Sequence, residues 1–303
     1  MAAGAQAAGG DEVYLDGAFL PRKEARVSVE DRGFLLGDGV YEVSPAYRGR
    51  FFRLDRHMTR LRKGLEALKI DFDPSRLPEV HQELLERNGL SRGRPSVVYV
   101  QLTRGVAPRT HHFPEEPVSP TVYGYAKAHD RTPRSRWEEG WGAVTVPDQR
   151  WSRADVKTIA LLPNVLAQEA ARRAGVPDAL MVRDGLALEG GHSNLFVVFG
   201  EALVTHPASN QILHGVTREC VLELARAEGL RVEERPIPLG ELEDATELFF
   251  TGTTTEVRPT VELDGRSVGD GRVGPVTRTL YRRFLEQVDE ECGGGGWEEW
   301  GSP

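Results

Sequence analysis

Residues 155–170, with the sequence DVKTIALLPNVLAQEA, contain one of only five lysines in a chain that has thirty-three arginines. An arginine stays protonated in a protein, whereas a lysine that is withdrawn from water can lose its proton and attack a carbonyl group. Lys157 lies just before an apolar run and a Pro-Asn pair that opens a helical pattern. The ends of elements carry catalytic groups more often than their middles, so the position favours a chemical role. A lysine considered alone is more often a solvated surface group.

The composition is that of a globular protein with an ample core, because 39% of the 303 residues are hydrophobic and 28% are charged. A net charge of −8 gives no chain-wide positive field for nucleic acid or anionic lipid. The two cysteines, Cys220 and Cys292, are not expected to form a disulfide, which fits a reducing compartment. No secretory signal or transmembrane run is visible. We therefore expect a cytoplasmic protein with neither nucleic-acid nor membrane partners.

The order of strand-like and helix-like segments predicts two α/β domains. We expect a small N-terminal α/β domain at 11–126, a polar and unpatterned linker at 127–135, and a larger α/β domain at 136–289. Residues 1–10 and 290–303 are rich in glycine and have no strand or helix periodicity, so we expect both to be disordered tails.

Local patterns set the expected elements. The first half contains two hairpin-like pairs of strands, with Asp16-Gly17 and Arg48-Gly49 as their turns. An amphipathic helix is expected at 54–70, because its leucines and Met58 recur on one stripe, and a second helix ends near Asn88-Gly89. In the second half strands alternate with helices. There, ELFFTGTTTEV (247–257) is expected to be one strand and 275–288 the final helix.

Three polar clusters of the second half lie at turns. Glu189, in LEGGHSNLF, stands between an apolar strand and two glycines. Val216 and Thr217 begin a helix, where free N–H groups and the helix dipole favour an anion. The threonines of FFTGTTTEV could line a cradle for a phosphate or a carboxylate. Each cluster alone also has a simpler interpretation, as an exposed carboxylate, a helix N-cap or a preference for strand structure.

The stretch RGVAPRTHHFP in the first half places Arg109 and His111 two residues apart. If that stretch is extended, both side chains point to one face and could grip a carboxylate. His111 and His112 would then face opposite ways, and no zinc-type spacing is present, so we expect no metal site. The segment DRGFLLGDGVYE lacks the glycine patterns of nucleotide-binding loops.

Seven stretches of the sequence, taken together and in their order along the chain, resemble the motifs of one known family. Any one of them alone would be weak evidence. They are EDRGFLLGDGVYEV, DRHMTRL, QLTRGVAPRTHHFP, DVKTIALLPNVLA, LEGGHSNLF, THPASNQILHGVTR and ELFFTGTTTEVRP. Over nearly its whole length the chain resembles the class IV (fold type IV) pyridoxal-phosphate aminotransferases, and among them the D-amino-acid aminotransferases. The resemblance implies a two-domain fold. It also implies transamination of D-amino acids, of the type D-alanine plus 2-oxoglutarate to pyruvate plus D-glutamate, by a ping-pong mechanism through a Lys157 aldimine.

The resemblance implies a role for each of several residues. Lys157 would hold pyridoxal 5'-phosphate covalently and move a proton, and Glu189 would face the pyridine nitrogen and favour its protonated form. The other implied cofactor contacts are Arg60, the backbone of Val216 and Thr217 and the side chain of Thr253 or Thr254 for the phosphate, and Leu213 for the ring.

The substrate α-carboxylate would be bound by Tyr41, Arg109 and His111. In the family, the residues that correspond to Arg109 and His111 reach in from the partner subunit, so the resemblance implies a homodimer. The planar guanidinium of Arg109 suits a carboxylate better than a lysine would.

Some positions depart from the family pattern. His192 stands where the D-specific enzymes have a serine, Gly252 replaces a serine, and Pro45 replaces a lysine. These three departures make the substrate range uncertain, and they affect the expected reaction type less. Alternatives within the fold are a branched-chain L-amino-acid aminotransferase, which would share Lys157 and Glu189, and a 4-amino-4-deoxychorismate lyase. A non-enzymatic carrier of vitamin B6 is the alternative outside catalysis.

Overall fold

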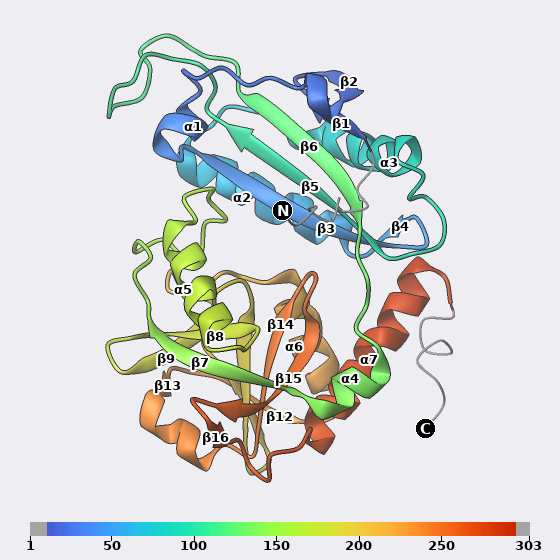
Figure 1. Ribbon diagram of the computed structural model, residues 1–303, viewed down its shortest axis with the longest axis vertical. Coiled ribbons are helices and arrows are strands. Elements are labelled where there is room, and N and C mark those ends of the chain that lie inside the picture. Colours follow the sequence, from blue (N-terminus) through green and yellow to red (C-terminus); the bar gives the residue numbers. More distant parts are fainter. Residues whose placement is uncertain (1–10, 295–303) are drawn as a thin grey trace, which may run out of the picture. The chain divides into compact units, whose positions relative to one another are not determined.

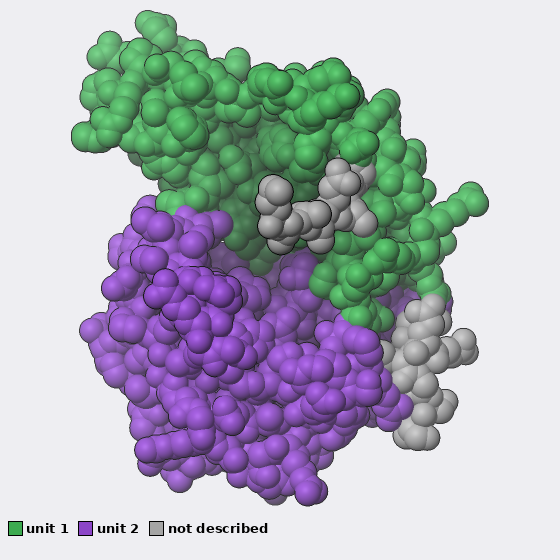
Figure 2. Space-filling view, viewed as in Figure 1, with its two compact units in different colours: residues 1–131, 156–160, 291–293 green, residues 132–155, 161–290, 294–303 purple. Residues whose placement is uncertain are grey.

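The computed structural model describes residues 11–294 (Figure 1), and these residues belong to two compact units. Among them, unit 1 takes in 11–131, 156–160 and 291–293, and unit 2 takes in the remainder (Figure 2). Within this described range, no helix is both long and apolar enough to cross a membrane.

Unit 1 contains an antiparallel sheet whose described strands lie in the order β2-β1-β6-β5-β3-β4. The strands are β1 (Glu12–Leu15), β2 (Ala18–Pro21), β3 (Gly39–Tyr47), β4 (Arg50–Phe51), β5 (Ser96–Thr103) and β6 (Thr121–Ala128). Both expected hairpins are confirmed, since β1 pairs with β2 and β3 pairs with β4. Their turn residues have positive φ angles, 47° at Asp16 and 55° at Arg48, each followed by a glycine, as two-residue hairpin turns require.

Two helices cover one face of this sheet, α2 (Leu54–Leu68) and α3 (Leu77–Arg87) (Figure 1). The expected apolar stripe is confirmed: Met58, Leu61 and Leu65 are buried and belong to one core cluster with Val100 and Leu102 of β5. The remaining described helices of unit 1 are short: η1 (Arg22–Glu24), α1 (Arg32–Leu36) and η2 (Pro74–Arg76). The sequence did not predict α1, because one and a half turns give no periodicity to detect.

Residues 156–160 belong to unit 1 because their backbone pairs with the start of β3. The amide N of Tyr41 donates to the carbonyl O of Lys157 at 2.9 Å, and that of Ile159 donates to Gly39 O at 3.1 Å. Gly39 is required here, since a Cβ at that position would lie 2.5 Å from Leu102 O of the neighbouring strand. The start of β3 therefore fixes the backbone of Lys157 beside Tyr41.

Unit 2 contains a mixed sheet in the order β12-β11-β10-β14-β15-β7-β8-β9-β13, with β16 paired to β15. Its strands are β7 (Trp141–Pro147), β8 (Asp178–Arg183), β9 (Leu186–Gly190), β10 (Asn194–Phe199), β11 (Ala202–Thr205), β12 (Arg231–Glu234), β13 (Ile237–Pro238), β14 (Glu247–Gly252), β15 (Glu256–Leu263) and β16 (Arg266–Ser267). A further pairing, Glu189 of β9 with Asn194 of β10, closes the strands from β10 through β14, β15, β7, β8 and β9 into a circuit.

The described helices of unit 2 are α4 (Arg134–Glu139), α5 (Leu162–Arg173), α6 (Val216–Ala227), η3 (Leu239–Asp244) and α7 (Pro275–Cys292), of which the last two residues are assigned to unit 1. Leu195, Val197, Leu248 and Phe250 are fully or almost fully buried in the core of the sheet. These inward-facing residues lie on β10 and β14, which are neighbours in the sheet, so the apolar runs of the sequence are buried strands of the unit.

Helix α4 overlaps the segment that we expected to be a linker. Its single tryptophan explains its presence: Trp137 is 2% exposed, its indole N–H donates to Val257 O at 2.7 Å, and its ring stacks on Tyr281 with centroids 4.7 Å apart. One apolar residue in six gives no helical signal in a sequence. Because unit 1 also takes in 156–160, the compact units do not follow the predicted domain limits, which stay predictions.

Two expected elements are wrong in their extent. The stretch 247–257 forms two strands, because β14 ends at Gly252 and a turn of threonines leads into β15. Helix α7 continues to Cys292, past the expected start of the tail at 290, because Cys292 is buried and Arg48 donates to Gly293 O at 2.7 Å. The rest of that expected tail, 295–303, and the expected tail 1–10 lie outside the described residues.

Glu247 on β14 caps the first turn of α7, and its loss should destabilise unit 2. Its carboxylate accepts from the backbone N of Val276 at 3.0 Å and of Thr277 at 2.8 Å, and from the Thr277 hydroxyl at 2.7 Å. We expect E247A to lower the free energy of unfolding by about 2 kcal/mol, measured as a lower midpoint in urea. E262A removes an exposed glutamate on β15 and is the matched control. Equal midpoints for E247A and E262A would contradict the capping role.

Candidate active site

Lys157 lies against an aromatic wall in unit 1. Its Nζ is 4.3 Å from the centre of the Tyr41 ring, and the Tyr41 ring stacks on that of Tyr99 with centroids 5.5 Å apart. All three side chains are half-buried. Backbone pairing and the ring face together restrict where the amine can be, and a reacting group must be restricted in this way to attack in one direction.

A buried network beside β3 fixes Arg60. Arg60 Nε donates to Glu42 Oε2 at 2.9 Å and its Nη2 donates to Oε1 at 2.6 Å, which is a two-pronged contact. His57 Nδ1 lies 3.0 Å from the same Oε1. Glu42 is 0% exposed and His57 is 1% exposed, so one carboxylate sets the plane of the guanidinium.

The charges in this network can be assigned. Burial opposes the ionisation of Glu42, but the charge of Arg60 and the hydrogen bond from His57 outweigh it and lower the pKa of the carboxyl. Burial lowers the pKa of His57, and the charges of Arg60 and Lys157 add to this effect, against the pull of Glu42. At neutral pH Glu42 is therefore charged, and His57 is neutral and donates through its Nδ1–H.

Glu189 is the centre of a second network, in unit 2. It is 3% exposed, near the end of β9. Asn194 Nδ2 donates to its Oε2 at 2.8 Å, the backbone N of Leu213 lies 3.1 Å from both carboxylate oxygens, and Arg150 Nη1 forms an ion pair with it. The predicted residues Glu189 and Leu213 are therefore brought together by a direct hydrogen bond.

Arg150 is itself held by a carboxylate. Its Nε donates to Asp148 Oδ1 at 2.9 Å and its Nη2 to Asp148 Oδ2 at 3.0 Å, while Arg183 Nη2 lies 2.9 Å from that Oδ2. Sequence reasoning missed Asp148, Arg150 and Asn194. A buried carboxylate requires a cation, but nothing in the sequence indicates which of thirty-three arginines provides it.

The electrostatics of Glu189 reflect these opposing influences. Burial raises the pKa of Glu189 to about 7, although the charge and hydrogen bond of Arg150 and the Leu213 N–H act in the opposite direction. The carboxyl therefore titrates near neutral pH. Such a group can exchange a proton with, or accept a hydrogen bond from, a cationic ring nitrogen.

The start of α6 offers backbone donors for an anion. Gly215 is the N-cap, and Val216 and Thr217 are its first helical residues, whose N–H groups have no partner inside the helix. A Cβ at position 215 would lie 2.0 Å from Asn194 Oδ1, so only glycine fits there. The same asparagine thus contacts Glu189 and borders the helix start.

The turn between β14 and β15 adds hydroxyl groups. Thr253 and Thr254, the predicted phosphate contacts, are half-buried in this turn. In the described part of the chain, the buried hydroxyls of Ser193, Thr251 and Thr255 have no hydrogen-bond partner. Unsatisfied buried donors are costly, and here they suit a ligand rich in acceptor oxygens. Thr251 and Thr255 are among the threonines of FFTGTTTEV that could line a cradle, whereas sequence reasoning gave Ser193 no role.

The departures from the family pattern are placed as follows. His192 is exposed, and its Nδ1 accepts from Gln168 Nε2 of α5 at 2.6 Å. A Cβ at Gly252 would lie 3.3 Å from Thr255 Oγ1, a close contact that the glycine avoids. Pro45 is buried in β3, opposite Val97 of β5.

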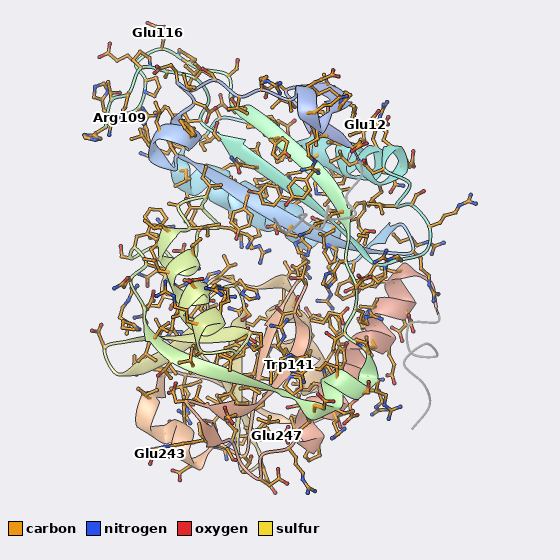
Figure 3. All side chains as sticks on the ribbon, viewed as in Figure 1. Glu12, Arg109, Glu116, Trp141, Glu243 and Glu247 are labelled. Carbon is orange, nitrogen blue, oxygen red and sulfur yellow. The ribbon has the colours of Figure 1, made fainter. Side chains whose placement is uncertain are left out.

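Arg109 and His111 lie on the loop between β5 and β6, where both are exposed. The condition that this stretch be extended is not met, because the backbone N of Thr110 donates to Pro108 O at 2.9 Å and turns the chain. In Figure 3 Arg109 lies on this loop, beyond the edge of the sheet of unit 1. The loop keeps both residues near each other without placing them on one strand face.

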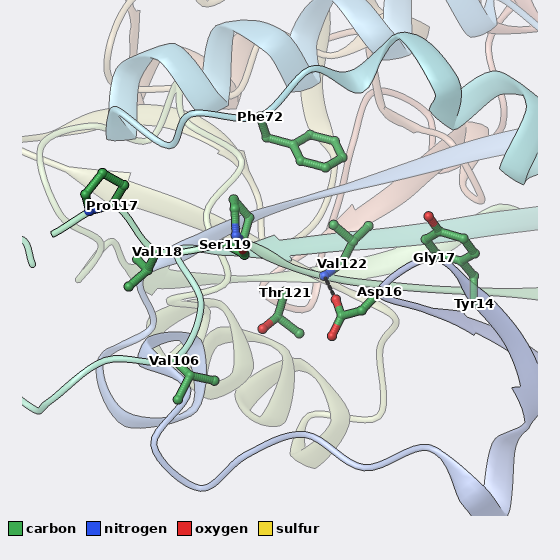
Figure 4. Close-up of a pocket in the computed structure, with 11 residues that line it drawn as sticks. Tyr14, Asp16, Gly17, Phe72, Val106, Pro117, Val118, Ser119, Thr121 and Val122 are labelled. Carbon is green, nitrogen blue, oxygen red and sulfur yellow. Dashed lines mark hydrogen bonds between the residues drawn. The ribbon is translucent and has the colours of Figure 1, made fainter.

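A pocket of about 670 Å³ lies elsewhere in unit 1, at the base of this loop (Figure 4). It is lined by Tyr14, Phe72, Val106 and residues 117–122, and none of the predicted site residues lines it. We therefore do not assign it to the candidate site. Among the described residues, no group of three or more His, Cys, Asp or Glu side chains could hold a metal ion.

A model of the family described as amino-transferase class IV matches residues 39–263. The chain belongs to this family. It is 39% identical over 280 residues to the D-alanine aminotransferase of Staphylococcus haemolyticus, a match that covers 92% of this chain and 98% of the relative. It is 38% identical over 280 residues to the D-alanine aminotransferase of Bacillus licheniformis, with the same coverage.

Solved structures of the family have the same fold. The branched-chain aminotransferase of the archaeon Thermoproteus uzoniensis with norvaline matches with a TM-score of 0.83 and 28% identity, over 93% of this chain and 97% of that one. The Escherichia coli branched-chain enzyme matches with a TM-score of 0.83 and 25% identity, over 91% and 94%. The predicted class IV family and the α/β (α+β) fold class are thereby confirmed.

The titration of Glu189 should make the stability of the cofactor-free aminotransferase depend on pH. The folded-state pKa of about 7 lies above the ordinary 4.5, so an unfolded chain releases this proton first as pH rises. The contribution of Glu189 to stability is thus complete below pH 4.5 and is lost as pH rises through 7. We expect the melting temperature of E189Q minus that of wild type to increase over this interval and then level off.

The change of that difference with pH is the test, because E189Q also removes the ion pair between residue 189 and Arg150, which shifts the melting temperature by itself. Glu201 is an exposed glutamate of the same unit, and E201Q is the matched control. A difference curve for E189Q that is flat between pH 4.5 and 7.5, like that of E201Q, would rule out the raised pKa.

Proposed function

We propose that this chain is a D-amino-acid aminotransferase that transfers the amino group of a D-amino acid such as D-alanine to 2-oxoglutarate. The observation that carries the proposal is the position of the Lys157 amine against Tyr41 in a chain of this family. The curated relatives support the substrate class, because those at 36–39% identity over about 92% of the chain are D-alanine aminotransferases. We also propose that the enzyme acts in the cytoplasm, a reducing compartment that suits the buried thiols of Cys220 and Cys292.

The proposed cofactor is pyridoxal 5'-phosphate, and the residues present fit its three functional parts. Lys157 offers an amine for the aldehyde, and Glu189 a carboxylate for the ring nitrogen. Arg60, the Val216 and Thr217 N–H groups and the threonine turn suit the phosphate, which the unsatisfied hydroxyls beside that turn support. When bound, the cofactor withdraws electrons from the substrate Cα.

The proposed roles follow from the atoms. Lys157 Nζ would accept the proton from the substrate Cα and would then donate it to C4′ of the cofactor. The Tyr41 ring would keep the amine in the position from which it can reach both atoms. Glu189 would accept a hydrogen bond from the ring N–H and stabilise its positive charge. Arg150 and Asn194 would orient the carboxylate for this contact.

The substrate α-carboxylate would be bound by Tyr41, Arg109 and His111, the last two from a partner subunit. The exposed apolar surface of unit 1 supports a homodimer. Five large apolar side chains there are 48% to 74% exposed: Val27, Val29, Phe34, Val106 and Phe113. Val106 and Phe113 lie on the same loop as Arg109 and His111, and apolar surface of this kind is typical of an interface.

A second candidate is a branched-chain L-amino-acid aminotransferase. The solved structures favour it, since the two reported above are branched-chain enzymes that share the fold. Lys157 and Glu189 would serve it equally well. The side of the pocket that holds the α-carboxylate decides between the two, because one lysine delivers protons to one face of the cofactor only.

Paired substrates test the proposal. With 2-oxoglutarate as acceptor, we expect pyruvate from D-alanine at a much higher rate than branched oxo acid from L-leucine. K157A should abolish turnover, and borohydride treatment of wild type should fix the cofactor mass on the peptide that contains Lys157. R109M should lower kcat/KM for D-alanine by about tenfold to a hundredfold, the loss of one charged hydrogen-bond contact.

R92M, at an exposed arginine of the same unit, is the matched control for R109M and should behave as wild type. Higher activity with L-leucine than with D-alanine would assign the chain to the branched-chain reaction instead. No product from either pair would favour the lyase or the vitamin B6 carrier, and release of pyruvate from 4-amino-4-deoxychorismate would then identify the lyase.

Subunit complementation tests the dimer. A heterodimer made with two affinity tags would combine one K157A subunit with one R109M subunit. If Arg109 serves the partner's Lys157, one of the two sites is intact and the heterodimer has about half of the wild-type activity. If Arg109 serves its own subunit, both sites are defective and activity stays at the level of the two homodimers. The K157A homodimer with wild-type Arg109 is the baseline.

A further inference from the structure

Two buried arginines of unit 1 meet at Asp38. Arg32 Nε donates to Asp38 Oδ2 at 2.9 Å, and Arg104 donates to the same oxygen through Nε at 2.8 Å and to Oδ1 through Nη2 at 3.0 Å. Arg32 is 2% exposed and Arg104 is 7% exposed. Burial opposes ionisation of Asp38, but the hydrogen bonds and charges of the two arginines outweigh it and lower its pKa. We call these three residues the Asp38 cluster.

The other donors of both arginines reach backbone and aromatic groups. Arg32 Nη1 donates to the carbonyl O of Thr110 at 2.9 Å, and Thr110 is the residue between Arg109 and His111. The guanidinium of Arg104 lies 3.8 Å from the centre of the Phe113 ring. The loop between β5 and β6 is thus contacted at two points, one on each side of His111.

The same cluster is tied to α2, the helix that carries Arg60. Arg104 Nη1 donates to Lys69 O at 2.9 Å and its Nη2 to Leu68 O at 2.7 Å, so it satisfies carbonyls at the end of that helix. The cluster therefore has a rigid base, because the arginines that touch the loop are fixed by a helix end and by a shared carboxylate.

Within its own unit, the loop has few other contacts beyond the pairing of Val106 with Asp31 and the hydrogen bond from the Ala107 amide to Glu30 O. Arg109, His111 and Phe113 are exposed, and the returning arm of the loop, 117–120, lines the 670 Å³ pocket (Figure 4). Between Thr110 and Phe113, the other contacts are short-range ones such as Thr110 Oγ1 to His112 O at 3.1 Å. The two guanidinium contacts thus connect this part of the loop to the body of unit 1.

We propose that Arg32 and Arg104, joined through Asp38, are positioning residues that hold Arg109 and His111 where the substrate α-carboxylate binds. This inference rests on the proposed function. A guanidinium can do this because its several N–H groups can donate to Asp38 and contact a loop group at the same time. The compact ammonium group of a lysine cannot span both. A small displacement of a binding group is enough to weaken a carboxylate contact, since these contacts depend on geometry.

Two variants test the proposal. R32K keeps the charge for Asp38 but cannot span to Thr110 O as well. F113L removes the ring over Arg104 at a position that is 48% exposed, so it leaves the core intact. The matched control is R94K, which changes an exposed arginine of the same unit that pairs with Asp130, away from the cluster.

Hydrogen–deuterium exchange gives the first readout and needs no activity. The hydrogen-bonded amides of Ala107 and Thr110 should exchange about tenfold faster in R32K and F113L than in wild type and R94K, because fewer contacts hold the loop in place. Exchange elsewhere in unit 1 and the amount of bound cofactor should not change. Unchanged exchange in both variants would overturn the proposal.

Steady-state kinetics with the holoenzyme give the second readout. KM for D-alanine and for 2-oxoglutarate should rise about tenfold with a small change in kcat, while the half-reaction with D-alaninol, which lacks the carboxylate, should keep its rate. Faster exchange with an unchanged KM would overturn the positioning role and leave the proposed function intact. A wild-type protein without D-amino-acid activity would remove the proposed function, and the exchange rates alone would then decide whether the cluster anchors the loop.

Discussion

The need to compensate carboxylates that are withdrawn from water organises the functional regions of both units. Such a carboxylate is very unfavourable unless cations and N–H donors surround it. Glu42 is surrounded by Arg60 and His57, Glu189 by Arg150, Asn194 and the Leu213 N–H, and Asp38 by two arginines. Each of these sets draws together segments that are distant in the sequence. These contacts hold each charged side chain in one orientation. A catalytic site requires side chains that are fixed in this way.

The regular part of the fold could be predicted from the sequence. The leucine stripe of α2 and the positive-φ turns of the two hairpins are local patterns, and the structure has them where they were expected. The elements that the sequence did not predict were missed for local reasons as well. Helices α1 and α4 are too short for periodicity, and the threonine turn after Gly252 was hidden because threonine favours strands. A short element depends on tertiary contacts, such as those of Trp137, that no window of sequence contains.

The residues of the candidate site could be proposed from the sequence, but the residues that support them could not. Lys157, Glu189 and the start of α6 carry residue types whose reactivity or donors are visible in the sequence. Asp148, Arg150 and Asn194 act through three-dimensional contacts, so the sequence shows them only as ordinary polar residues in loops and at a strand start. Asn194 illustrates this point. Its backbone pairs with that of Glu189 and closes the strand circuit of unit 2, and its side-chain amide donates to the Glu189 carboxylate. Fold and chemistry therefore share one residue.

The pairing of 156–160 with β3 has a consequence for how the protein is made. More than a hundred residues separate Gly39 from this segment, so a growing chain exposes the edge of β3 long before its partner is synthesised. During that interval the backbone groups of residues 39–41 are an open template for another nascent strand. The segment 156–160, once it is synthesised, closes that edge. The same pairing that fixes Lys157 beside Tyr41 therefore also covers a possible site of aggregation.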